Sequence, residues 1–153
     1  MDDRLRRIAD YLLNCKDWAA FDPASVAALL LPHIFVIRIE RDSPDHSIRL
    51  RVRLAGTALD TVFAQPLAGR CIEEFMHGPR SADVLRGFQR CAENHMPVWM
   101  RQVVCIRNQL PRYVEGIAIY LEPERIYGGL IVGEIESRAF DDNEATFESM
   151  SPF

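Results

Sequence analysis

The clearest indication of the fold is the stretch Ser47-Ile48-Arg49-Leu50-Arg51-Val52-Arg53-Leu54-Ala55-Gly56-Thr57-Ala58-Leu59. Apolar residues and arginines alternate from 48 to 54, which predicts a half-buried strand with a period of two residues. Gly56 then lets the chain leave the strand at dihedral angles that other residues resist. Thr57 is placed to cap a short helix over 57–63. The predicted buried face holds Ile48, Leu50, Val52 and Leu54, and the exposed face holds Arg49, Arg51 and Arg53.

Strand-like segments lie on both sides of a helical middle. A β-rich run over 33–40 precedes the first stretch, and a helix with one apolar stripe is predicted over 81–94. A short segment over 71–76 lies between the two helices. Three further β-rich runs follow at 98–107, 112–121 and 130–136, separated by predicted loops at 108–111 and 122–129. This order favours an α+β fold with a five-stranded antiparallel sheet and helices on one face.

An amphipathic helix is predicted at the N-terminus, because Leu5, Ile8 and Leu12 recur at helical spacing. A second, short helix is predicted from the Asp22-Pro23 start to Pro32. The stripe of the first helix must be buried. We therefore expect it to pack on the sheet or to form a homodimer contact with a second copy of the chain.

Three motifs carry a resemblance to a known family. They are Asp22-Pro23 followed by Leu30-Leu31-Pro32-His33-Ile34-Phe35, then Arg53 to Leu59, and then Leu67-Ala68-Gly69-Arg70. They resemble the bacterial PAS_5 family of PAS domains. The resemblance covers about 22–136 and implies a sensory or protein-interaction role in signalling with no shared catalytic residues. The chain then divides into an N-terminal helix and linker (1–21), a PAS-like domain (22–136) and an acidic, partly disordered tail (137–153).

Charge, cysteine spacing and hydropathy exclude several classes of protein. The net charge of −4 argues against nucleic-acid binding. No apolar run is long enough for a membrane span. The four cysteines (Cys15, Cys71, Cys91 and Cys105) lie far apart, which favours a reducing cytoplasm over a disulfide framework. At 153 residues, no output domain accompanies the sensor, so its signal is expected to leave through another protein.

Flavin is considered because Gly69-Arg70-Cys71 resembles the start of the Gly-x-Asn-Cys-Arg-Phe-Leu-Gln motif of light-sensing PAS domains. In register, Cys71 stands where that motif has Asn, and Ile72 stands where the reactive cysteine belongs. An acidic pair, Glu73 and Glu74, follows and would repel a flavin phosphate. Flavin is therefore not expected, since a motif needs its context.

Haem and metal sites are also not expected. His77 and His95 flank the 81–94 helix but lie outside its apolar stripe, so neither is placed as an axial ligand. Cys91 and His95 share one helical face, yet two ligands fall short of a zinc site. We expect no cofactor and no metal.

Catalysis has little support, because no nucleophile elbow, phosphate loop or zinc-protease motif occurs. The arginines of the 48–54 strand are better explained by cross-strand pairing than by an anionic ligand. The acidic candidates for that pairing are Glu40, Glu115, Glu134 and Glu136.

A ligand pocket between helices and sheet is the sharper hypothesis, against the alternative of a filled core. We predict a non-catalytic sensory PAS module that acts through a signalling partner, with a small ligand as a further option. The alternatives are a small-molecule-binding or isomerase-like pocket protein with a buried tyrosine or acid, and a structural adaptor without a ligand. The candidate pocket residues are Thr57, Phe63, Phe75, Phe88, Trp99, Tyr113 and Tyr120.

Overall fold

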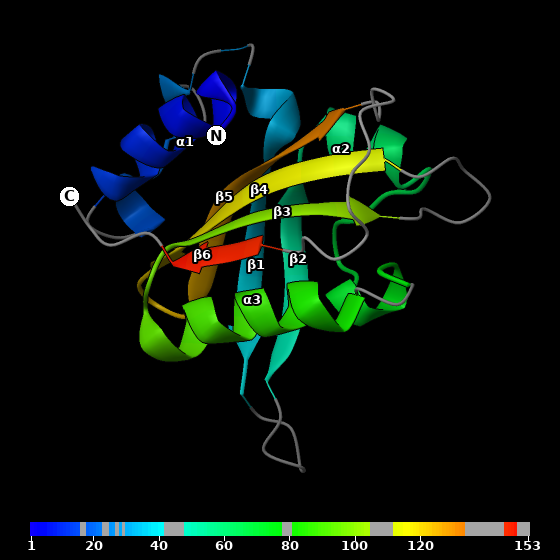
Figure 1. Cartoon of the computed structure of the whole chain (residues 1–153). Helices are drawn as coiled ribbons and strands as arrows, with labels where there is room; N and C mark the ends of the chain where they lie inside the picture. The colour runs from blue at the N-terminus through cyan, green and yellow to red at the C-terminus, as the bar shows by residue number, and fades with distance from the viewer. Residues whose placement is uncertain are drawn as a thin grey trace.

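A single antiparallel sheet organises the molecule (Figure 1). The computed structural model describes residues 1–15, 18–22, 25–26, 28, 30–41, 48–77, 81–104, 112–133 and 146–149. Its strands run in the order β2-β1-β5-β4-β3-β6. Their bounds are Ile34–Glu40 (β1), Arg49–Ala55 (β2), Val98–Val104 (β3), Arg112–Leu121 (β4), Arg125–Gly133 (β5) and Thr146–Ser149 (β6). The five predicted strands are confirmed, and β6 adds a short strand on β3 that the tail sequence did not predict.

Helices cover both faces of the sheet. The front face packs against α2 (Thr57–Val62), the 3-10 turn η4 (Ile72–Glu74) and α3 (Ser81–Asn94). The back face packs against α1 (Asp3–Leu13), so α1 and α3 lie on opposite sides of the sheet in Figure 1. Two more 3-10 turns, η1 (Trp18–Ala20) and η3 (Leu31–His33), connect α1 to β1.

Within the short helix predicted from Asp22 to Pro32, positions 23, 24, 27 and 29 lie outside the described residues, as do 105–111 and 134–145. Its predicted end at Pro32 instead lies inside the 3-10 turn η3. None of the described helices is both long and apolar enough to cross a membrane.

At the junction of β2 and α2, Gly56 and Thr57 have different roles from those predicted. Gly56 has an ordinary extended backbone (φ −69°, ψ 155°) and is itself the N-cap of α2. A Cβ at Gly56 would lie 2.2 Å from the carbonyl oxygen of Pro32, so a close approach between chain segments requires the glycine. Thr57 lies inside the helix and makes no cap with its side chain. In the turn that follows α2, Gly69 has a positive φ of +86°, a conformation that glycine adopts without steric cost.

Two details of the predicted sheet are wrong. A register shift opposite Val36 and Ile37 adds one residue to β2, so Leu54 packs against the back-face cluster and not beside Leu50 and Val52. The loop predicted over 122–129 is also too long, because β5 already begins at Arg125.

Candidate functional site

A small cavity lies in the front-face core, between the sheet and α2, η4 and α3. Its volume is about 60 Å³. Every described residue of its wall is apolar: Phe35, Ile37, Val52, Ala55, Leu59, Phe63, Leu67, Ile72, Phe75, Met76, Val84, Phe88, Met100, Val114 and Leu130. With no polar side chain in the described wall, such a site would select ligands by shape and by burial of apolar surface.

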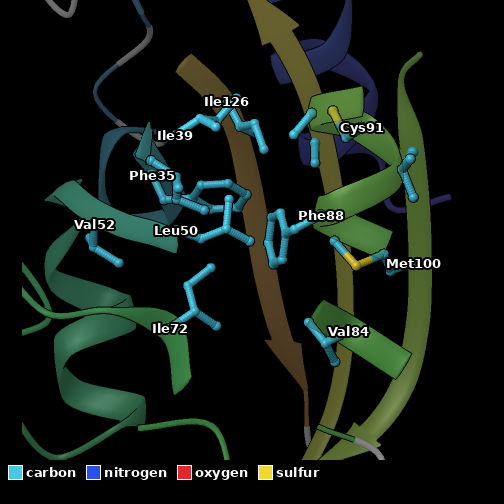
Figure 2. Close-up of a cluster of buried hydrophobic side chains, with 14 of the residues drawn as sticks. Phe35, Ile39, Leu50, Val52, Ile72, Val84, Phe88, Cys91, Met100 and Ile126 are labelled. Carbon is cyan, nitrogen blue, oxygen red and sulfur yellow. The ribbon is translucent and has the colours of Figure 1, made fainter. Parts of the chain in front are cut away.

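Two pairs of aromatic rings pack against each other in the wall of the cavity. Figure 2 shows Phe88 projecting from α3 toward Phe35 and Leu50 across the core. The Phe35 and Phe88 rings meet edge to face, with centroids 5.7 Å apart. Phe63, just after α2, and Phe75, just after η4, meet in the same way at 5.2 Å. The first pair is buried and the second is half-buried, so Phe63 and Phe75 form the part of the wall nearer to solvent.

Three of the seven candidate pocket residues line this cavity, namely Phe63, Phe75 and Phe88. Tyr120 packs against the same core, but its ring stacks on His95 with centroids 3.8 Å apart and stays outside the cavity wall. Thr57 is exposed at the start of α2. The hypothesis missed Phe35 and Leu67, although their place in an apolar run and beside a predicted turn indicated burial.

Trp99 and Tyr113 are corrections of a different kind, because they lie on the back face. Side chains alternate across a strand, and the neighbouring Met100 and Val114 face the front cavity. The Trp99 indole instead donates a hydrogen bond of 2.8 Å to Glu115 on β4.

Glu115 is the one buried charged side chain among the described residues, at 6% exposure. The Asp2 backbone N–H also donates to both of its carboxylate oxygens, at 3.1 and 3.2 Å. Glu115 therefore joins the start of α1 to the sheet. It lines neither the front cavity nor a second cavity, which lies on the back face between α1 and strands β1 and β5. The isomerase-like alternative would be favoured by a tyrosine or an acid buried beside an aqueous cavity. No buried acid among the described residues lines a cavity, whereas Tyr127, at 4% exposure, lies in the wall of a cavity on the back face.

The cysteine and histidine candidates lie apart from the cavity. Burial raises the pKa of the Cys91 thiol to about 12, so the thiol stays protonated. His95, four residues on, is exposed and stacked on Tyr120, and His77 is exposed as well. Among the described residues, no group of three or more His, Cys, Asp or Glu could hold a metal ion.

The arginine ladder of β2 is used in part for pairing within the sheet. The Arg51 guanidinium donates to Glu40 on β1 at 2.8 Å and also to the Gly69 carbonyl at 2.8 Å. Its hydrogen bond lowers the pKa of Glu40. The predicted partner Glu115 is engaged elsewhere, and Glu134 and Glu136 lie outside the described residues.

The predicted partner stripe of α1 is buried within the chain itself. Leu5, Ile8 and Leu12 are at most 2% exposed and pack on the back face. Of the two outcomes expected for this stripe, packing on the sheet is confirmed. In this structure the three side chains are not available to a second copy.

Comparison with known proteins supports the fold. No family model and no curated protein matches the chain, so assignment to the PAS_5 family is not confirmed. Among solved structures, the chain is similar to a LOV protein of Rhodobacter sphaeroides, with a TM-score of 0.51 over 90% of this chain and 71% of that chain, at 10% identity. A fungal LOV domain photoreceptor matches with a TM-score of 0.49 over 83% of this chain and 87% of that chain, at 16% identity.

The match to the Rhodobacter sphaeroides protein overturns the prediction that no flavin is bound. That prediction rested on the motif around Gly69 to Cys71 and on the acidic pair Glu73 and Glu74. The Rhodobacter sphaeroides structure is a LOV protein, a class of flavin-binding domain, and contradicts it. The front cavity has apolar walls that suit a flavin ring. Its volume of about 60 Å³ is small for one, and its described wall has no polar side chain for the polar edge of the ring. Gly69 and Arg70 are exposed, and Cys71 is half-buried outside the wall. What the comparisons show is the fold: the chain is a PAS-like α+β domain.

Proposed function

We propose that the chain is a bacterial, cytoplasmic and non-catalytic sensory module of the PAS_5 kind, which binds a small apolar ligand in the front cavity. One observation carries the proposal, namely that every described side chain around the cavity is apolar. Such a wall gives no acid, base or nucleophile to a bound molecule, so it favours sensing over chemistry. The PAS-like fold supports a sensory role only by analogy.

The size of the cavity implies how sensing would work. A cavity of 150 Å³ can hold benzene, and the front cavity measures about 60 Å³. A ligand would therefore bind an expanded form in which the half-buried pair Phe63 and Phe75 separates. By binding that form selectively, the ligand would shift the population toward it. The surface of α2 and η4 would then change for a partner protein to recognise.

A homodimer remains part of the proposal, in a changed form. Because Leu5, Ile8 and Leu12 are buried on the chain's own sheet, they can join two copies only if α1 is exchanged between them. Sedimentation equilibrium of the full chain, with and without residues 1–21, tests this. A dimer that persists without residues 1–21 would show that α1 is not the contact.

Toluene is the probe for the front cavity, with Leu67→Phe and Leu30→Phe as matched variants. Both leucines are buried, at 3% and 4% exposure, but Leu67 lines the front cavity and Leu30 lines a second cavity on the back face. We expect toluene to shift the amide NMR signals of 57–76 saturably in the native protein and in L30F, and to lose this effect in L67F. Failure to saturate, or equal binding by L67F, would overturn the proposal.

Flavin is tested in the same protein by adding flavin mononucleotide and separating free from bound flavin by gel filtration. A flavin absorbance band that travels with the native protein, and is lost in L67F, would identify flavin as the ligand of the front cavity. Such a result would replace the small apolar ligand proposed above.

A further inference from the structure

A second cavity lies on the back face, between α1, the segment before β1, and strands β1 and β5. Its volume is about 180 Å³, against about 60 Å³ for the front cavity. Most of its buried apolar residues belong to the core cluster built around α1, and Phe35 contributes to the walls of both cavities. Its described wall consists of Arg7, Ile8, Tyr11, Leu12, Phe21, Ser25, Val26, Leu30, Ile34, Phe35, Tyr127 and Gly128.

The wall suits an aromatic ring. Ile8, Leu12 and Leu30 supply buried aliphatic surface. The Phe21 ring lies 4.8 Å from that of Tyr127, centroid to centroid, tilted by 55°. A cavity of 150 Å³ can hold benzene, so the back cavity has room for one six-membered ring with a small substituent.

Two polar groups of the wall already have partners inside the protein. The Tyr11 hydroxyl donates to the Asp22 carbonyl and accepts from the Asp22 N–H, both at 3.1 Å. The Ser25 hydroxyl donates to the Asp22 carboxylate at 2.8 Å. These contacts leave Tyr11 and Ser25 little capacity for a ligand.

Two others, Tyr127 and Arg7, have no such partner in the part of the chain that the structure describes. The Tyr127 side chain is 4% exposed, and its hydroxyl makes no hydrogen bond with a described residue. Leaving a buried hydroxyl unpaired is unfavourable, and burial raises the pKa of Tyr127, which keeps the hydroxyl protonated as a donor. Arg7 is exposed, and its guanidinium forms no ion pair within the described part of the chain, whereas the adjacent Arg6 pairs with Asp3 at 3.2 Å.

We propose that the back cavity binds a small aromatic carboxylic acid with one ring, whose carboxylate pairs with Arg7 and whose ring lies among the side chains of α1 and β1. A guanidinium is well suited to a carboxylate, since it can donate two parallel hydrogen bonds. A hydroxyl on the ring would supply the missing partner of Tyr127. Among single-ring acids, hydroxybenzoates therefore fit better than benzoate.

Binding there would act on α1. Arg7, Ile8 and Leu12 come from α1, whereas Ile34 and Tyr127 come from the sheet, so a ligand between them joins the helix to the sheet. The bound form would hold α1 more firmly against β5, which gives this site an effect on the N-terminal helix that the front cavity does not have.

Calorimetric titration of the full chain with benzoate and 4-hydroxybenzoate tests the proposal. We expect Arg7→Gln to weaken both acids about tenfold or more, since hydrogen bonds to charged groups are the strong ones. The matched control is Arg6→Gln, which removes a neighbouring arginine outside the cavity wall and should leave both affinities unchanged. Tyr127→Phe should weaken 4-hydroxybenzoate and leave benzoate unchanged.

Leu30→Phe, which fills the back cavity, should abolish binding of both acids, and Leu67→Phe in the front cavity should not. Circular dichroism checks that each variant is folded. If L30F does not fold, the Arg7→Gln and Arg6→Gln pair still decides. The proposal fails if neither acid saturates the native protein, if R7Q binds as well as R6Q, or if L67F rather than L30F removes binding.

Discussion

The two faces of the sheet are built from different kinds of residue. The front core is closed by α2, η4 and α3 and leaves a cavity of about 60 Å³, around which every described side chain is apolar. The back core is covered by an eleven-residue helix and has a cavity of about 180 Å³. It includes the buried acid Glu115 and Tyr127, whose hydroxyl has no hydrogen-bond partner among the described residues. Close packing stabilises a domain, whereas unfilled space and unpaired polar groups cost stability.

This difference suggests that the two faces contribute unequally to the stability of the domain. The front face should supply most of the stability of the domain, because its cluster contains side chains from β1 to β5 and from α3. The back face should open first, since elements with fewer buried contacts have lower local stability. Substitutions matched across the two faces can test that inequality.

The largest difference is expected between Phe88→Ala and Phe21→Ala. Phe88 is 5% exposed in the front core and meets Phe35 edge to face, so its loss should lower the free energy of unfolding by about 3–5 kcal/mol. Phe21 is half-buried on the back face and should cost clearly less. Urea denaturation measures both, with an unchanged slope as the sign of an intact two-state transition. Equal losses would contradict the proposed inequality.

Close packing of α1 on the sheet gives the next effect. A Cβ at Gly129 would lie 2.6 Å from Cδ1 of Ile8 and 3.2 Å from Cδ2 of Leu5, so in Gly129→Ala either the buried Ile8 side chain or α1 itself must shift. We expect a loss of about 1–3 kcal/mol. Gly133→Ala in the same strand is the control, because its nearest neighbour is 3.8 Å away, on Tyr113, and the change should stay within about 0.5 kcal/mol. Equal losses of unfolding free energy in urea denaturation would mean that Ile8 or α1 can move away from Gly129 at little cost.

These glycines also show where prediction from the sequence reached its limit. Gly128 and Gly129 resemble a loop, because glycine is rare inside strands. The structure instead places them in β5, where a Cβ at Gly128 would lie 2.0 Å from the carbonyl oxygen of Ile117. Such glycines are required by the close approach of residues far away in the sequence, which local sequence patterns do not reveal.

Local sequence patterns were sufficient to predict those elements whose structure follows from their own residues. The stripe of Leu5, Ile8 and Leu12 predicted α1, and the bounds of α3 agree with the prediction from Ser81 to Asn94. The candidate pocket was harder, because an aromatic residue says nothing of the face it occupies until the register is known. Trp99 and Tyr113 show this, since a shift of one residue would have placed them in front.

The smallest effect is expected from the ion pair between Glu40 and Arg51, on the charged part of β1 and β2. Both side chains are about one-third exposed, at 28% and 32%, so solvent and salt screen the pair. Arg51 lowers the pKa of Glu40 in the folded chain. The pair therefore stabilises the fold above the ordinary pKa of glutamate, about 4.3, and that stability is lost as the pH falls through the lowered pKa of Glu40.

A double-mutant cycle with Glu40→Gln and Arg51→Gln, measured by urea denaturation, isolates the pair. The coupling should be favourable and small at pH 7, weaker at high salt, and absent once Glu40 is protonated. Arg51 also donates to the Gly69 carbonyl, a contact that Glu40→Gln leaves in place, so the arginine substitution alone should cost more than the glutamate substitution. A coupling as large as the Phe88 effect, or one that grows toward acid pH, would show that this exposed pair, and not the packing of the two faces, controls stability.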